Sequence, residues 1–70
     1  MKTNAQMESF LKSQNCWINK SISGYYRLFK GEEGNQIDSE LIHDDPGEED
    51  MYNYDFALYY FYCLITGEWE

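Results

Sequence analysis

The chain of 70 residues lacks positive charge over more than half of its length. All five lysine and arginine residues lie in residues 1–30, where Glu8 is the only acid, so this part carries a formal charge of +4. Residues 31–70 contain twelve acids and no lysine or arginine, which gives −12. Ordinary protein surfaces mix both signs, so such a one-sided sequence indicates solubility, steering or contact with a positive partner.

The chain also has few histidine and cysteine residues. There is one histidine, His43, and the two cysteines, Cys16 and Cys63, form no pair motif. The stretch DDPGEED lacks the ligand spacing of a calcium loop, and neither a phosphate loop nor a dinucleotide motif is present. We therefore expect no enzyme activity, no metal and no cofactor, with His43 as an exposed loop residue beside acids.

No apolar segment is long enough to span a bilayer. The uncharged run FALYYFYCLI, residues 56–65, is about half of the roughly 20 apolar residues that a spanning helix needs. The opening MKTNAQMESF has no apolar signal-peptide core. We expect a single domain over residues 1–70, in the cytoplasm, with reduced thiols.

The hydrophobic pattern predicts an α+β fold with an N-terminal helix, an antiparallel β-hairpin and a long aromatic C-terminal helix. Apolar residues within 4–18 recur on one helical face, and Asn4 or Thr3 is a suitable cap. Residues 16–42 favour strands, so the sequence does not determine the residue at which this helix ends. The hairpin is predicted at residues 25–30 and 36–42, around the turn sequence KGEEGN.

The C-terminal helix is predicted over residues 46–66. Asp45 is a good N-cap, Pro46 suits the first helical position, and Glu48 follows the cap by three residues. Gly67 is a natural stop. Strand propensity is also strong in residues 56–65, so a strand remains the alternative there.

This helix would be apolar on nearly every side. Such a helix is either the central element of the fold or meets another chain through one face, so a homodimer is a second possibility. The residues predicted for this core or dimer interface are Leu58, Phe61 and Ile65.

Function is indicated most directly by DSELIHDDPGEEDMYNYD, residues 38–55, in which eight of eighteen side chains are carboxylates. Helix-start chemistry and a solvated face explain part of this stretch, but not the absence of compensating bases. The functional hypothesis is a negative surface that replaces nucleic acid on a basic partner, with tyrosines as anchors. The predicted partner-binding residues are Glu32, Glu33, Asp38, Glu40, Asp44, Asp45, Glu48, Glu49, Asp50, Tyr52, Tyr54 and Asp55.

In size and charge the chain resembles the small acidic proteins that phages and mobile elements use against host enzymes. These include DNA-mimic inhibitors, anti-CRISPR proteins and some nuclease-immunity proteins. The resemblance concerns overall character and implies a basic nucleic-acid-binding partner, such as a nuclease, a polymerase or a CRISPR effector. Direct binding of nucleic acid is not expected, because a chain of net charge −8 repels phosphate. The alternative is a small dimeric structural or regulatory module that docks through its aromatic C-terminal helix.

Overall fold

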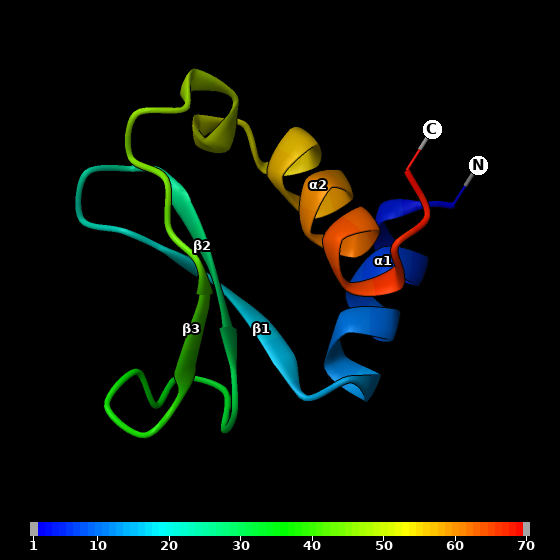
Figure 1. The fold of residues 1–70 in the computed structure, drawn as a ribbon, viewed down its shortest axis with the longest axis horizontal. Helices are drawn as coiled ribbons and strands as arrows, with labels where there is room; N and C mark the ends of the chain where they lie inside the picture. The colour runs from blue at the N-terminus through cyan, green and yellow to red at the C-terminus, as the bar shows by residue number, and fades with distance from the viewer. Residues whose placement is uncertain (1, 70) are drawn as a thin grey trace.

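The computed structural model describes residues 2–69 and contains a three-stranded sheet and two α-helices (Figure 1). In chain order the elements are α1 (Asn4–Ser13), β1 (Cys16–Lys20), β2 (Tyr26–Lys30), β3 (Glu40–His43), the 3₁₀ helix η1 (Glu49–Tyr52) and α2 (Tyr54–Thr66). The sheet is antiparallel with the order β1-β2-β3. The predicted α+β fold is therefore confirmed, and residues 56–65 are helical.

Helix α1 begins where the sequence predicts. The Thr3 side chain accepts a hydrogen bond from the Gln6 backbone N–H, and the Gln6 side chain accepts one from the Thr3 backbone N–H. This reciprocal pair is a capping box. The predicted extension to residue 18 is wrong, because the helix ends at Ser13 and Asn15 has a left-handed φ of 61°. Residues 16–20 instead form β1, which pairs with β2 along its full length.

The predicted hairpin is present as β2 and β3, but β3 begins at Glu40 rather than at residue 36. The Asn35 side chain accepts a hydrogen bond from the backbone N–H of Asp38 at 3.1 Å, which holds this segment in a turn. In the register, Leu28 faces His43 and Phe29 faces Leu41, so one residue of β3 has no partner. This β-bulge turns Ile42 toward the core, against which it packs.

Helix α2 begins at Tyr54, not at residue 46 as predicted. The Asn53 side chain accepts a hydrogen bond from the Phe56 backbone N–H at 3.0 Å, and the extended backbone of Asn53 separates η1 from α2. Asp45 caps only a local turn, through the N–H of Gly47. At the other end, Gly67 has φ 76° and ends the helix, as predicted.

The core lies between the two helices and one face of the sheet. Leu58 and Phe61 are completely buried in it, and Ile65 packs against it in a partly exposed position. Of the core-or-dimer residues, the structure thus places Leu58 and Phe61 in the core of a single chain. Cys16 and Cys63 are free thiols buried in the same core. No helix within residues 2–69 combines the length and the apolar character of a membrane span.

His43 is not the exposed loop residue that the sequence suggests. It is the last residue of β3 and is half-buried, with its ring 4.9 Å from that of Tyr60 and 5.5 Å from that of Phe61. The bulge in β3 allows this position, because it brings His43 opposite the core residue Leu28. His43 is therefore a packing residue of the helix-covered face.

Candidate partner-binding surface

All ten carboxylates that the sequence predicts for partner binding are exposed. Nine of them flank β3, in two groups that lie at opposite ends of the strand (Figure 1). The loop acids, before and at the start of β3, are Glu32, Glu33, Asp38 and Glu40. The η1 acids, between β3 and α2, are Asp44, Asp45, Glu48, Glu49 and Asp50. The structure thus places most of the predicted site around the two ends of this strand, with Glu33 also lining a groove beside β1.

Strand β3 is an edge of the sheet. It pairs with β2 on one side, and no other strand in residues 2–69 pairs with its outer side. A strand of four residues spans about 13 Å at roughly 3.3 Å per residue. A single partner can therefore contact both acidic groups and the strand edge between them.

The loop acids belong to an ordered loop. The Asn35 amide nitrogen donates to a carboxylate oxygen of Glu32 at 3.3 Å and to one of Asp38 at 3.2 Å. The Ser39 hydroxyl donates to the Glu32 carbonyl at 3.3 Å and accepts from the Trp17 indole N–H at 3.4 Å. These bonds tie the loop to the sheet and restrict the positions of its charges.

Gly31 allows the close approach that this loop requires. Its φ is 141°, and a Cβ at this position would lie 2.7 Å from the Ser39 hydroxyl oxygen. Any larger residue would be strained in its backbone and would displace Ser39. The loop acids are thus positioned by Gly31 as well as by side-chain hydrogen bonds.

The η1 acids are positioned by backbone groups and by the β1–β2 turn. A Glu48 carboxylate oxygen accepts from the backbone N–H of Asp50 at 3.4 Å. A hydrogen bond to Asp44, followed by burial and by the negative charge of Asp44, raises the pKa of Tyr25 above its ordinary value. Met51 belongs to η1 and is buried in the core, so it holds η1 against the rest of the fold.

The two tyrosines that the sequence predicts as anchors differ in exposure and in their contacts. Tyr52 is 46% exposed; its hydroxyl donates to the Pro46 carbonyl at 3.3 Å and its ring meets Tyr25 edge-on. Tyr54 is half-buried, donates its hydroxyl to a Glu8 carboxylate oxygen, and packs edge-on against Tyr26 at 5.3 Å. Tyr52 therefore keeps an accessible ring beside the η1 acids, whereas Tyr54 joins α1, β2 and α2.

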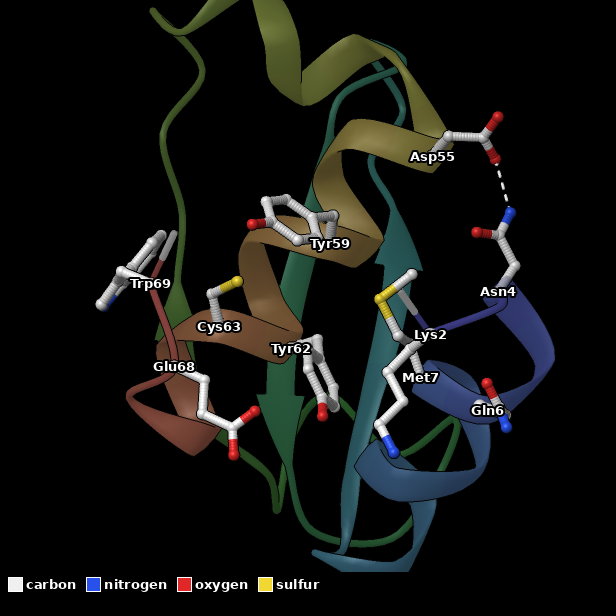
Figure 2. Close-up of a pocket in the computed structure, with 10 residues that line it drawn as sticks. All are labelled: Lys2, Asn4, Gln6, Met7, Asp55, Tyr59, Tyr62, Cys63, Glu68 and Trp69. Carbon is white, nitrogen blue, oxygen red and sulfur yellow. Dashed lines mark hydrogen bonds between the residues drawn. The ribbon is translucent and has the colours of Figure 1, made fainter.

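Asp55 is the one predicted acid that lies away from β3. It is in the first turn of α2, and its carboxylate accepts a hydrogen bond from the Asn4 side-chain amide at 2.7 Å (Figure 2). The bond links the starts of the two helices. Asp55 therefore has a structural contact on the helix side of the molecule.

A groove of about 690 Å³ lies between α1, α2 and the segment after α2 (Figure 2). Its residues are Lys2, Asn4, Gln6, Met7, Asp55, Tyr59, Tyr62, Cys63, Glu68 and Trp69. Figure 2 shows Met7, Tyr59 and Tyr62 projecting into the space between the elements, with Glu68 and Asp55 at its rim. Among the described residues that line the groove there is no histidine. Within residues 2–69, no group of three or more His, Cys, Asp or Glu side chains is placed to hold a metal ion.

The sequence reasoning missed the second face of the sheet. On the side away from the core, Trp17 and Phe29 stack with ring centroids 4.8 Å apart, and the Arg27 guanidinium lies 5.3 Å from the Phe29 ring centroid. Leu41, opposite Phe29, is on the same side and is 47% exposed. We call this side, opposite the helix-covered face and formed by Trp17, Asn19, Arg27, Phe29 and Leu41, the open face. Trp17 and Phe29 are themselves buried on it, at 7% and 5% exposed, so Leu41 is its exposed apolar residue. The pattern assigned residues 16–18 both to the first helix and to the strand-favouring region, and the β-forming residues Trp17 and Ile18 were the signal for β1.

Comparison of this chain with protein families, with curated proteins and with solved structures finds no match. Its function must therefore be argued from the surface itself: nine exposed carboxylates around the open edge of a small sheet, with an exposed tyrosine beside them.

Proposed function

We propose that this protein acts by binding, as an inhibitor that occupies the basic nucleic-acid-binding surface of a nuclease, a polymerase or a CRISPR effector in the host cytoplasm. One observation carries the proposal: nine exposed carboxylates flank β3, and residues 31–70 supply no lysine or arginine to neutralise them. Surface charge of one sign steers a partner of opposite sign and raises the association rate.

The density of the acids is comparable with that of nucleic acid. The molecule measures 26 Å along its second axis, and β3 runs roughly along this direction (Figure 1). One strand of a duplex carries about eight phosphates over that length, at one charge per 3.4 Å. Nine carboxylates on one edge offer a similar number of negative charges to a groove that binds phosphate.

The test begins with capture of partners from a bacterial lysate on the tagged protein, at low and at high salt, with identification by mass. We expect a nucleic-acid-binding protein that is lost at high salt and displaced by duplex DNA, because both compete for the same charges. Binding of the purified partner would then be followed kinetically.

Charge reversal supplies the matched comparison. Glu48→Lys with Glu49→Lys should slow association by about tenfold, since steering depends on the charge at the contact. Glu68→Lys with Glu70→Lys changes the net charge equally, at acids that follow α2 in the sequence, and should slow association much less. A partner that binds the first variant as fast as the parent would contradict the proposal.

A docking role for α2 is the second candidate, favoured by the apolar residues that α2 leaves exposed. Phe56 and Leu64 on the helix, and Trp69 after it, are each more than one-third exposed. Leu58 and Phe61 are core residues, so their replacement would destabilise the fold rather than test docking. If the protein forms a dimer through α2, Leu64→Glu should convert it to a monomer in sedimentation experiments while its circular dichroism stays unchanged.

A further inference from the structure

We infer that the outer edge of β3 binds an extended, lysine- or arginine-rich segment of the partner as an additional strand of the sheet. The inference rests on the proposed function and specifies how the basic partner is held. It combines three observations: an open strand edge, acids at both of its ends, and an exposed apolar side chain at its centre.

The backbone of β3 provides the first part of such a site. In an edge strand, the N–H and C=O groups that do not bond to the neighbouring strand point away from the sheet, where a further strand can pair with them. In residues 2–69, β3 pairs with β2 alone. Addition of a strand from a partner is a recurring mode of peptide recognition, in which backbone hydrogen bonds contribute affinity and alternate side chains contribute specificity.

Charge determines which strand can bind. The loop acids lie at one end of β3 and the η1 acids at the other, so a bound segment would meet carboxylates at both of its ends. A second copy of this chain would bring its own nine acids against them, and like charges in this position repel. The edge therefore excludes self-pairing and favours a segment with basic residues on both sides of its paired centre.

The apolar side chain of Leu41 indicates what the centre of the segment should contain. Leu41 is 47% exposed on the open face, next to the Trp17–Phe29 stack. Alternate residues of an added strand would lie on this face, beside Leu41. A β-branched or aromatic residue there would bury apolar surface of both chains.

The opposite edge of the sheet provides an internal comparison. Strand β1 ends at Lys20 and contains no acid. The groove beside it is lined by Lys12 and Lys20 as well as by Glu8 and Glu33, so its charges nearly balance and offer a basic segment little net attraction. Selective pairing with β3 is expected on charge grounds.

The experiment uses the full chain and a labelled synthetic peptide in which four alternating valine and threonine residues lie between two lysines on each side. The control peptide has the same sequence and charge, but its four central amides are N-methylated and cannot donate hydrogen bonds. We expect the parent peptide to bind roughly tenfold more tightly or better, because the methylated one loses several backbone hydrogen bonds. It should also slow amide hydrogen exchange in residues 40–43 but not in residues 16–20.

A pair of protein variants tests the apolar contact. Leu41→Ser should weaken binding of the unmethylated peptide by about fivefold, through loss of buried apolar area. Ile22→Ser, at a fully exposed apolar residue in the β1–β2 turn, should leave binding unchanged.

Three results would overturn the inference. Equal affinity of the two peptides would show that charge alone binds them, which leaves the proposed function standing. Slowed exchange in residues 16–20 would place the peptide on the wrong edge. Failure of both peptides to bind at low salt would show that β3 does not accept a basic strand, while the capture experiment would still decide the proposed function separately.

Discussion

Single carboxylates in this protein serve two different purposes. Glu8 and Asp55 accept hydrogen bonds from Tyr54 and Asn4 and so connect the two helices. Within residues 2–69, no hydrogen bond reaches the side chains of Glu33 or Glu49, which lie at opposite ends of β3. Carboxylates of the first kind stabilise the fold, and those of the second kind remain available to a partner.

The Tyr54–Glu8 contact should make stability depend on pH in the alkaline range. Burial and then the bond to Glu8 raise the pKa of Tyr54, so folding favours the un-ionised hydroxyl. The contribution of this hydroxyl to stability is complete below the ordinary tyrosine pKa of about 10. It is lost as the pH rises above that pKa, because the tyrosine ionises first in the unfolded chain. Tyr54→Phe should therefore cost about 1–2 kcal/mol at pH 7, and this difference should shrink at pH 11.

Urea denaturation of parent and variant at both pH values measures this difference, in which the ionisation of other groups largely cancels. Tyr52→Phe is the control, because its hydroxyl bonds to a carbonyl oxygen and not to a carboxylate. If Tyr54→Phe lowered the free energy of unfolding by the same amount at pH 7 and at pH 11, the assigned role of the hydroxyl would be contradicted.

At the scale of elements, two residues have the side-chain chemistry to cap α2, and the structure shows which of them does so. Asn53 accepts a hydrogen bond from the first turn of α2, whereas Asp45 caps only the turn that precedes η1. Asn53→Ala should lower the free energy of unfolding by about 1 kcal/mol, the usual cost of losing an N-cap. Asp45→Ala should change it by less than about 0.5 kcal/mol. Thermal and urea unfolding of the two variants would reverse this order if the helix began at residue 46.

These caps also show what the sequence could and could not predict. Thr3 and Gly67 act through bonds within a few residues, so local pattern located the first start and the last stop. Local sequence does not determine the start of α2, because both Asp45 and Asn53 can act as an N-cap. Burial of Met51 in the core holds η1 between these two residues. Strand β1 lies in the region 16–42 that favours strands, but the sequence did not define it as a separate strand, because its bounds are set by its pairing with β2.

The same distinction applies to the candidate site. Exposure of the acids follows from their density in turn-rich sequence. Their arrangement around an open edge follows from the strand order β1-β2-β3 and from the bulge at Ile42, which are properties of the assembled sheet. Sequence therefore indicated the charge of the partner, and the fold indicates where and how it binds.

At the scale of the whole molecule, a net charge of −8 on 70 residues disfavours the compact state through self-repulsion. If the acids near η1 are retained for a partner, their neutralisation should stabilise the free protein. The variant Glu48→Gln, Glu49→Gln, Asp50→Asn preserves shape, and the amide at 48 can still accept the bond from the backbone N–H of residue 50. We expect it to gain about 0.5 kcal/mol of stability at low salt and to lose that gain near 1 M salt, where the Debye length is about 3 Å.

The matched control is Glu8→Gln, because Glu8 is an acid that the fold itself uses. Its replacement should destabilise the protein at low and high salt alike, since a hydrogen bond to a charged acceptor is weakened. Guanidinium chloride is itself a salt, so urea denaturation at several sodium chloride concentrations is the suitable measurement. If the triple variant proved less stable than the parent at low salt, the η1 acids would be stabilising the fold. Their exposure would then no longer argue for a basic partner.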